Sequence, residues 1–415
     1  MRLFCLEVKR VLRTRMTKIL MLLVLAATVF FAVLPLSFPY GTVWEEDGST
    51  RNIRGLEGIR YIKELQKDVA GTVTSEKVKQ AAYDYQAVLD EYEVGTTYEL
   101  LDELYEKRIR PLTPLTNLLR EAYTDLETGI APSIWEIDLE SVGDVYKVLD
   151  DRLSTMMELQ QEGHPEAQEQ AEALYGQVEK PFVFYPGGDG NLMDYEILVA
   201  FLILIFCVAM AAPVFSSDYQ TGADDILRCT KHGRLRLGFV KVLSALAISA
   251  GATILCLVVY LLISNGLVGW EWTKSSMQMF YSALSLPNLT IGELQWCIAA
   301  SGLLTILATV GTVLFVSSKC SNAMVTTVVG VFLCILPVIA NIFIPGDAGL
   351  WLGTILPTGG VSLQGSMLYA LSDFQFLHLG NYSVWTPYAI LTFAALEFVG
   401  FSAAAVFSYA RYRRA

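Results

Sequence analysis

Six long runs of apolar residues constrain what this chain can fold into. The runs cover approximately 19–36, 197–215, 242–263, 296–316, 323–344 and 388–409. Each is close to the length of about 20 helical residues that crosses the roughly 30 Å hydrocarbon core of a bilayer. Because an unpaired backbone polar group is costly in lipid, apolar runs of this length cross membranes as α-helices. The chain is therefore predicted to be an all-α integral membrane protein with six transmembrane helices.

The charged residues are concentrated in one insert between the first two apolar runs, over 39–193. This insert holds 31 of the 42 acidic residues and 14 of the 30 basic residues, a net charge of −17. The whole chain is only 17% charged and has a formal net charge of −12. An excess of acid makes a nucleic-acid partner improbable, because such proteins present basic surfaces. The composition thus divides the chain into a membrane part and one polar, acidic part.

Helical periodicity dominates the insert. Apolar residues recur every three or four positions, which is the spacing of one helical face. The stripes are Val78, Ala81, Tyr85, Val88, Leu89 and Tyr92; Leu115, Leu118, Leu119 and Ala122; and Val145, Val148, Leu149, Leu153 and Met156. We expect a helical bundle that is entered through a linker over 39–52. Its negative charge is interpreted as a solvated surface, and attraction of a cationic substrate or peptide is the alternative.

Basic residues between the runs predict the orientation, because Lys and Arg accumulate in short cytoplasmic segments. With a cytoplasmic N-terminus, the short inner segments carry fifteen Lys or Arg, whereas the short outer loops carry one, Lys274. The fifteen are Arg2, Lys9, Arg10, Arg13, Arg15, Lys18, Arg228, Lys231, Arg234, Arg236, Lys241, Lys319, Arg411, Arg413 and Arg414. We therefore expect both termini in the cytoplasm, 39–193 outside the cell, and a location in the plasma membrane.

These predictions divide the chain into three parts. Residues 1–38 form an amphipathic N-terminal helix and the first transmembrane helix, which is longer than the 7–15-residue apolar core of a signal peptide. Residues 39–193 form the extracytoplasmic helical domain. Residues 194–415 form a transmembrane domain of five helices.

The connection after the second apolar run contains a predicted short helix over 216–237. Ser216 or Ser217 is expected to cap its N-terminus. Asp224 and Arg228 stand four residues apart, in the order that favours an ion pair on a helix. Gly233 is expected to end the helix. The sequence therefore predicts a small amphipathic helix at the inner membrane face.

This connection resembles the intracellular coupling region of type-2 ABC exporter permeases. Those proteins have an acid, a glycine four residues later, then a Leu, a stretch with Ser or Thr, an Arg, and a Lys where the next span begins. The matching residues here are Asp218, Gly222, Leu227, Thr230, Arg234 and Lys241. The family usually has Glu in place of Asp218, and a Ser/Thr-Pro pair where Cys229-Thr230-Lys231 stands. The resemblance also covers the six spans, the large domain after the first, and the return loop over 317–322.

The resemblance implies a membrane-spanning permease subunit of an ATP-binding cassette exporter. Such a subunit is not itself an enzyme and holds no cofactor, because a separate ATPase dimer binds and hydrolyses the ATP. It works with a second permease copy, identical or related, in the lipid bilayer. The resemblance also implies short re-entrant helices over 346–385, around Leu356-Pro-Thr-Gly-Gly360. The role implied for Asp218, Gly222, Leu227, Arg234 and Lys241 is to dock and orient the coupling helix against the ATPase.

The sequence contains few signs of catalysis. G-x-x-x-x-G-K-[ST], the loop that binds ATP phosphates, is absent. Gly360-Val-Ser362 begins like a nucleophile elbow but lacks the closing glycine. His164, His232 and His378 are far apart in sequence and in predicted topology, so we expect no metal site. The alternative to a transporter is a membrane immunity or sensor protein whose acidic extracellular domain binds an envelope ligand.

One acid, Glu397, falls in the middle of the last apolar run. An ionised carboxylate in lipid is costly, so this side chain should face protein or water. It is interpreted either as part of a substrate or proton pathway, or as a structural hydrogen-bond acceptor from a neighbouring Ser, Thr or Tyr. Pro213 and Pro337 are expected to kink the second and fifth spans.

Overall fold

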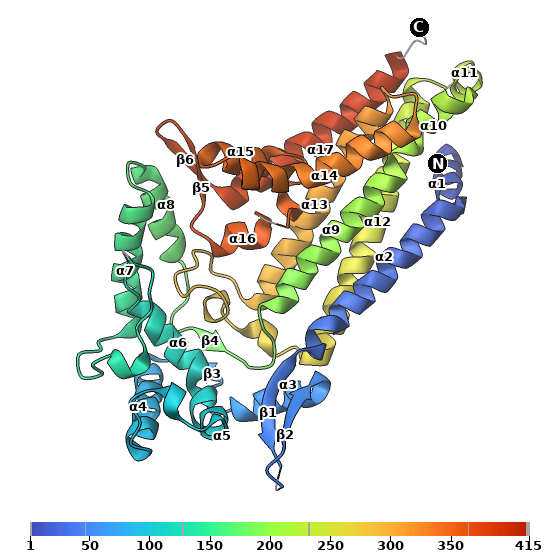
Figure 1. Cartoon of the computed structure of the whole chain (residues 1–415). Coiled ribbons are helices and arrows are strands. Elements are labelled where there is room, and N and C mark those ends of the chain that lie inside the picture. Colours follow the sequence, from blue (N-terminus) through green and yellow to red (C-terminus); the bar gives the residue numbers. More distant parts are fainter. Residues whose placement is uncertain (1, 46, 127, 231–232, 364, 412–415) are drawn as a thin grey trace.

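The computed structural model describes residues 2–45, 47–126, 128–230, 233–363 and 365–411, and it is mostly helical (Figure 1). Within these residues, six helices are long and apolar enough to cross a membrane. They are α2 (Arg15–Val33), extended by the 3-10 turn η1 (Leu34–Ser37); α9 (Asn191–Ala211), extended by α10 (Pro213–Thr221); α12 (Leu235–Val268); α13 (Ile291–Ser317); α14 (Ala323–Phe343); and α17 (Thr386–Arg411). The prediction of a helical membrane protein with six spans is confirmed.

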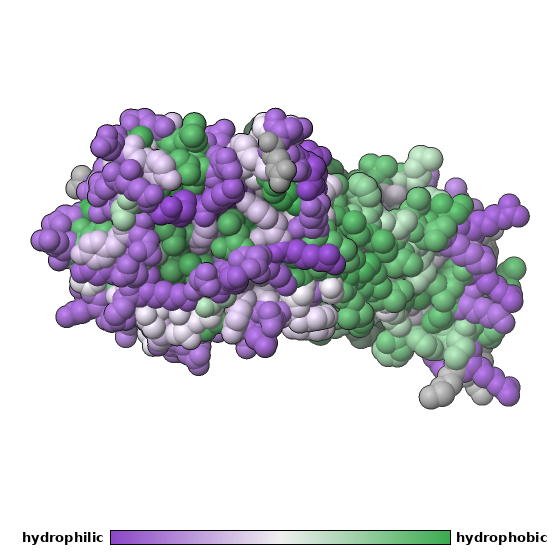
Figure 2. All heavy atoms as spheres, turned by 90° about the horizontal axis from the view of Figure 1, so that it is seen from below, coloured by the Kyte–Doolittle hydropathy of each residue, from purple (hydrophilic) through white to green (hydrophobic). Residues whose placement is uncertain are grey.

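The surface agrees with this assignment. On the face drawn in Figure 2, a band of hydrophobic residues separates a large hydrophilic part of the molecule from a smaller hydrophilic end. Leu22, Phe332 and Leu396 are exposed apolar side chains on three different spans. Exposed apolar area of this extent is unusual for a soluble monomer and is typical of a lipid-facing surface.

Helix α13 is the centre of the bundle. It contacts α9, α12, α14 and α17, and it is the most deeply buried of the six spans. A capping box at its start, in which Thr290 and Glu293 bond each other's backbone N–H, fixes where it begins. Small residues allow close approach, because a Cβ added at Gly311 would lie 2.9 Å from the Ser402 hydroxyl of α17.

The helices of the insert lie at the end of the bundle opposite the N-terminal helix α1 (Arg2–Arg13), as Figure 1 shows. They are α3 (Gly55–Leu65), α4 (Ser75–Glu91), α5 (Asp102–Leu104), α6 (Thr113–Ala122), α7 (Val145–Gln160) and α8 (Pro165–Tyr175), with short turns η2 (Thr97–Glu99), η3 (Tyr105–Ile109), η4 (Arg110–Leu112) and η5 (Ile134–Glu136). The three predicted stripes lie on α4, α6 and α7. Whether 39–193 is an extracytoplasmic domain stays a prediction.

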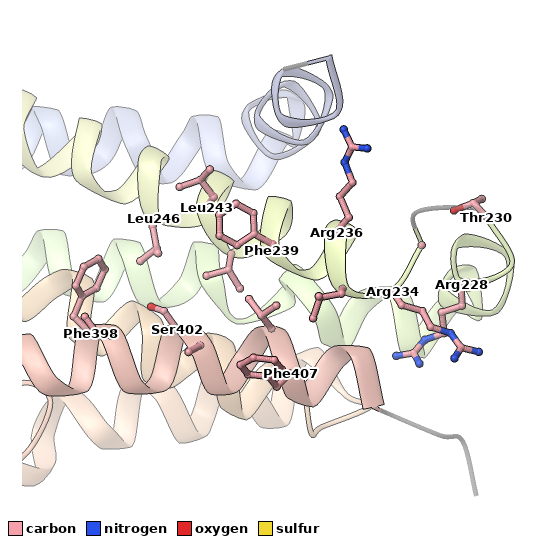
Figure 3. Close-up of a pocket in the computed structure, with 16 residues that line it drawn as sticks. Arg228, Thr230, Arg234, Arg236, Phe239, Leu243, Leu246, Phe398, Ser402 and Phe407 are labelled. Atoms are coloured by element: carbon pink, nitrogen blue, oxygen red, sulfur yellow. The ribbon is translucent and has the colours of Figure 1, made fainter.

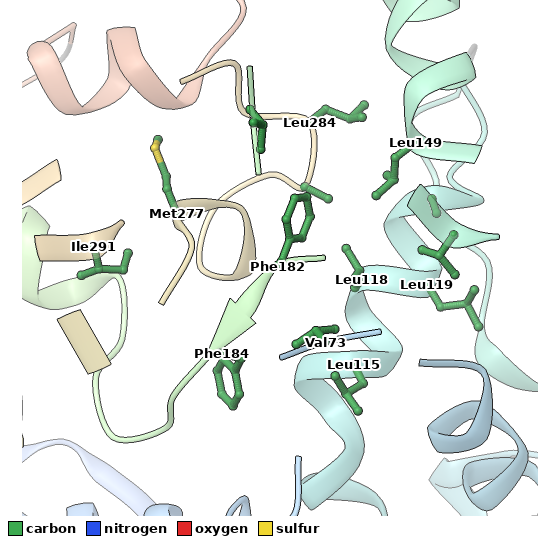
Figure 4. Close-up of a cluster of buried hydrophobic side chains, with 14 of the residues drawn as sticks. Val73, Leu115, Leu118, Leu119, Leu149, Phe182, Phe184, Met277, Leu284 and Ile291 are labelled. Atoms are coloured by element: carbon green, nitrogen blue, oxygen red, sulfur yellow. The ribbon is translucent and has the colours of Figure 1, made fainter. Parts of the chain in front are cut away.

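The core of the insert continues into the membrane part. Leu118, Leu119 and Phe182 of the insert belong to the same buried cluster as Met277 and Leu284, which lie in the loop between α12 and α13 (Figure 4). The Glu121 carboxylate accepts the backbone N–H of Ala283 at 2.8 Å. This loop carries two further 3-10 turns, η6 (Trp272–Lys274) and η7 (Met277–Met279). The insert is therefore packed against the ends of α12 and α13.

One expectation about local structure is wrong, whereas the mostly helical fold agrees with the all-α prediction. Among the described residues, three short two-stranded antiparallel sheets accompany the helices. The strands are β1 (Pro39–Trp44) with β2 (Thr50–Arg54), β3 (Gly71–Thr72) with β4 (Val183–Phe184), and β5 (Phe376–Leu379) with β6 (Tyr382–Trp385). The segment 39–52, interpreted as a linker, forms most of the β1–β2 hairpin. Its Thr42, Val43 and Trp44 are β-branched or aromatic, which suits a strand.

The segment 346–385 contains short helices, as the resemblance implied. They are α15 (Asp347–Ile355), the 3-10 turn η8 (Gly359–Val361) and α16 (Met367–Ser372). The Thr309 hydroxyl of α13 donates to the Pro357 carbonyl at 2.7 Å, which holds the turn between α15 and η8 against the bundle. That these helices re-enter the membrane stays a prediction.

A stacked histidine pair joins the insert to the last span. The rings of His164, just before α8, and His378, on β5, lie 3.6 Å apart with an interplanar angle of 12°. Because the two histidines are far apart in the sequence and in the predicted topology, this contact was not expected. The Ser383 hydroxyl lies 2.9 Å from the His378 ring nitrogen, and its backbone N–H donates to Glu166 at 2.9 Å. Because the β5–β6 hairpin leads directly into α17, this contact couples α8 to α17.

Acidification is expected to loosen this contact. Burial, and then the charge of the neighbouring His164, lower the pKa of His378 below its ordinary value, whereas the Asp347 carboxylate opposes the shift. The released hairpin therefore binds a proton more readily than the packed hairpin, so the contact is fully stable above about pH 6.5 and weakens as the pH falls below that value. Hydrogen-exchange protection of 376–385 should drop between about pH 7.5 and about pH 5.5.

A variant that cannot be protonated provides the control. His378→Phe keeps an aromatic ring against His164, and its protection factors should depend less on pH than those of the natural chain. Glu166 also faces this hairpin, through the Ser383 N–H, and it is unchanged in the variant. Equal pH dependence in the two chains would contradict the role of His378.

Candidate functional site

The predicted site residues gather at the end of the bundle where the second span turns toward the third. Helix α10 ends at Thr221, Gly222 follows, and α11 (Ala223–Arg228) begins at once. Gly222 has a φ of 73°, in the left-handed region that glycine adopts without strain. A Cβ added there would meet no atom within 4 Å, so conformation and not space favours glycine. Gly222 therefore sets the direction in which α11 leaves the second span.

The predicted helix over 216–237 is wrong in its extent. Helix α10 continues the second span, and α11 ends at Arg228, before α12 starts at Leu235. Ser216 and Ser217 are not caps, because their hydroxyls donate to the carbonyls four residues earlier, Ala212 and Pro213. A serine can either cap the start of a helix or bond to the preceding turn inside one, so the presence of serine alone does not locate a helix start. Gly233 lies beyond α11, and Lys231 and His232 lie outside the described residues.

Pro213 marks the junction between α9 and α10, where the ring removes one backbone donor. The Ser317 hydroxyl at the end of α13 donates to the Ala212 carbonyl at 2.7 Å. The same oxygen accepts the N–H groups of Phe215, at 3.2 Å, and Ser216, at 3.1 Å. One buried hydroxyl thus bonds three backbone groups of the second span and holds α10 against α13, the fourth span.

A cluster of charges lies beside this junction and is called here the Asp218 cluster (Arg10, Asp218 and Lys241). Arg10 of α1 donates to one Asp218 oxygen at 3.1 Å, and the Lys241 ammonium of α12 contacts the other. The ammonium also lies 3.3 Å from the Val214 carbonyl. The Lys241 side chain is fully buried, and that of Asp218 is 7% exposed. Three helices therefore meet on a single carboxylate.

Together with the neighbouring acid Glu7, the Asp218 cluster is neutral in charge. Asp218 faces two cations, and Glu7 of α1 accepts a bond from Arg10 at 2.9 Å. Two acids thus balance two bases, which buried charges require because desolvation makes an unpaired charge costly. The structure brings Asp218 and Lys241 together, and their role in coupling stays a prediction. Arg10 was counted only as an inner basic residue, and no local pattern pointed from it to residue 218.

A second set of contacts fastens α11 to the end of the last span. Arg228 lies 3.2 Å from the buried Asp224 carboxylate, as the four-residue spacing predicted. Its guanidinium also donates to the Tyr409 carbonyl at 2.6 Å and lies 4.8 Å from the centre of the Tyr409 ring. That ring packs against Phe215 of α10, with 4.9 Å between ring centres. Tyr409 was not predicted, because nothing in its sequence neighbourhood distinguishes it from other aromatic residues at span ends.

The other predicted coupling residues occupy different positions. Leu227 packs on the apolar cluster of the bundle. The Thr230 hydroxyl donates to the Leu227 carbonyl at 2.7 Å, which closes the turn after α11. Arg234 is exposed at the start of α12 and forms no ion pair with any residue that the structure describes. Arg234 is therefore not part of the Asp218 cluster.

Glu397 and Glu196 are acids within the spans that have no partner among the described residues. Glu397 is half-buried in the middle of α17 and makes no hydrogen bond or ion pair with the described residues. The expected bond from a neighbouring Ser, Thr or Tyr is thus not made in the described chain. Glu196 near the start of α9 is fully buried, and both its oxygens lack a partner among the described residues. The sequence reasoning missed Glu196 because the apolar run begins at the next residue.

The described residues contain no group of three or more His, Cys, Asp or Glu side chains that could hold a metal ion. The site is therefore a junction of paired charges and short helices at the ends of spans. No family model and no curated protein matches the chain.

Neutralising Asp218 is expected to be more harmful than neutralising Lys241. Asp218→Asn leaves Lys241 buried without an acid, and breaking a buried pair in this way costs about 3–5 kcal/mol. Lys241→Met leaves Asp218 still bonded to Arg10, so its cost should be smaller. The double variant should recover part of the loss because no buried ammonium remains. Thermal unfolding of the purified chain in detergent measures all three.

The exposed pair Glu103–Lys107, in which the carboxylate and ammonium are 2.6 Å apart, provides the matched control. Lys107→Met should change stability by no more than about 1 kcal/mol, since surface pairs contribute little. If Asp218→Asn shifted the unfolding temperature no further than Lys107→Met, the Asp218 cluster would not hold these helices together.

Proposed function

We propose that this chain is the membrane-spanning permease subunit of an ATP-binding cassette exporter, with ATP hydrolysed by a separate ATPase subunit. The observation that carries the proposal is the double attachment of one short helix pair, α10–α11. Asp218 ties it to α1 and α12, and Arg228 ties it to α17. A helix pair fastened to α1 and to two spans, α12 and α17, suits the transmission of force from a partner.

In this proposal, the ATPase dimer binds α11 and the loop that follows it. Ile226 is 75% exposed on α11, which gives a partner an apolar contact beside the exposed Asp225. Closure of the ATPase dimer on ATP would rotate α11 about Gly222. Because Asp218 is buried and paired with both Arg10 and Lys241, α1, α10 and α12 would move together, between an inward-facing and an outward-facing state. The resemblance to type-2 exporters supplies the assignment of Asp218, Gly222, Leu227, Arg234 and Lys241 to coupling.

A second permease copy would complete the pathway. Helix α17 is the least buried of the six spans, and α2 and α14 are also largely exposed. Glu397, half-buried on α17 without a partner in the described chain, would face that copy or the water-filled pathway. The transported substrate is not specified by this arrangement. The chain would lie in the plasma membrane with cytoplasmic termini and 39–193 outside.

Accessibility to a membrane-impermeant thiol reagent tests the orientation. Cys229 is an exposed free cysteine at the end of α11, so it should react only after the membrane is permeabilised. A cysteine introduced by Thr50→Cys, on the exposed strand β2, should react in intact cells. Peptide mass spectrometry identifies the modified cysteine. Labelling of Cys229 in intact cells would contradict a cytoplasmic α11 and the whole proposal.

Isolation of the complex separates a transporter from a membrane sensor. Purification of the full chain in mild detergent should recover a second polypeptide that carries the phosphate-binding loop G-x-x-x-x-G-K-[ST]. Recovery of the chain alone, in several detergents and after cross-linking, would favour the immunity or sensor function instead.

Gly222→Ala is expected to uncouple the ATPase without unfolding the permease. Alanine at a φ of 73° is strained by about 1–2 kcal/mol, and no neighbour blocks its Cβ. The strain changes the direction of α11, so permease-dependent ATP hydrolysis in lipid nanodiscs should fall several-fold while the unfolding temperature changes little. Gly400→Ala is the control, because Gly400 lies within α17 and a Cβ there also meets nothing within 4 Å. If the ATPase hydrolysed ATP at the same rate with Gly222→Ala as with the natural permease, α11 would not transmit force.

A further inference from the structure

A groove lies between the start of α12 and the second half of α17. Its volume is about 970 Å³ (Figure 3). Its walls are mainly apolar, with Phe239, Leu243 and Leu246 on α12 and Phe398, Val399 and Phe407 on α17. Phe239 and Phe407 are each more than half exposed, although they lie on membrane-spanning helices. The groove is therefore open to the surroundings of the bundle.

The two ends of the groove differ in chemistry. Arg228, Thr230 and Arg234 line one end, and Figure 3 shows Arg228 and Arg234 close together there. Arg236 also belongs to the lining, but its side chain projects away from them toward α1 in the same view. No acidic residue lines the described groove. Since Asp224 and the Tyr409 carbonyl occupy Arg228, Arg234 is the cation left to bind an anion among the described residues at this end of the groove.

The length of the groove matches one leaflet of a bilayer. From Arg234 to Leu246 the helix rises about 18 Å, at 1.5 Å per residue. Half of a hydrocarbon core about 30 Å thick is about 15 Å. In the predicted arrangement of the spans, the charged end of the groove lies near the membrane surface, and Phe398 at its apolar end lies in the middle of the apolar run 388–409. An occupant must therefore carry an anion at the membrane surface and an apolar chain that extends toward the midplane.

We propose that the groove binds an anionic phospholipid, with its phosphate at Arg234 beside Thr230 and one acyl chain along Phe239, Leu243 and Leu246. The planar guanidinium of arginine suits bidentate bonding to a phosphate. This inference does not rest on transport activity. It places a lipid beside the site where Arg228 fastens α11 to α17, and the bound phosphate would neutralise the charge of Arg234, which has no ion-pair partner among the described residues.

Native mass spectrometry of the delipidated full chain tests the proposal. The probes are dioleoyl-phosphatidylglycerol, which is anionic, and dioleoyl-phosphatidylcholine, which has the same chains and no net charge. One molecule of the anionic lipid should bind at least about tenfold more tightly than the neutral lipid. Arg234→Gln should remove most of that preference, because the phosphate loses its unpaired cation. Equal binding of the two lipids by the natural chain would overturn the proposal.

Matched variants separate the site from general charge and general apolar contact. Arg13→Gln removes an exposed cation from α1, away from the groove, and should leave the preference for the anionic lipid unchanged. Leu243→Trp fills the groove and should weaken binding of the anionic lipid, whereas Leu22→Trp, at an exposed position on α2, should not. If Arg13→Gln reduced binding as much as Arg234→Gln, the attraction would be a property of the whole surface and the site would not exist.

A second copy of the chain is the competing occupant. A cysteine introduced by Val399→Cys, on the α17 wall, would then form a disulfide with its counterpart in native membranes under oxidising conditions. Efficient cross-linking at this position would overturn the lipid assignment. Its absence, together with selective binding of the anionic lipid, is the result that the proposal expects.

Discussion

The carboxylate of Asp218 holds together the end of the bundle from which the candidate site is built. It is almost fully buried and is bonded to cations from two other helices, Arg10 on α1 and Lys241 on α12. A buried charge must keep its partners, because separation exposes an uncompensated charge to a medium of low polarity. The three helix ends therefore have one favourable arrangement. The position of α10, and with it the start of α11, follows from this constraint.

The same long helices are attached at their other ends to the polar insert. Met277 and Leu284, between α12 and α13, share a buried core with the insert, and the His164–His378 stack joins α8 to the hairpin that precedes α17. Helix α11 is tied to α17 through Arg228 and Tyr409. A displacement of α11 would thus act on long helices whose opposite ends contact the insert. In the proposed exporter, these helices would transmit movement from α11 to the insert.

What the sequence predicts well depends on local interactions. Apolar length specifies the six spans, and a four-residue spacing predicts the Asp224–Arg228 pair. Contacts between distant segments leave no such pattern, so Arg10 with Asp218 and His164 with His378 were missed. The serines at 216 and 217 misled because a hydroxyl inside a helix bonds its own preceding turn as readily as it caps a new one. Glu196 was missed because the apolar run begins directly after it.

The position of Glu397 suggests that the working protein includes a contact that the described chain alone does not provide. It lies in the middle of α17, where lipid would strongly disfavour an ionised carboxylate, and the described residues give it no partner. The opposite end of the same helix, at Tyr409, is closely packed against α10 and α11. The helix is therefore firmly held where it meets the candidate coupling site and incompletely covered near mid-membrane. Water or a second protein surface at Glu397 removes this electrostatic conflict, and both are what a pathway between two permease copies would provide.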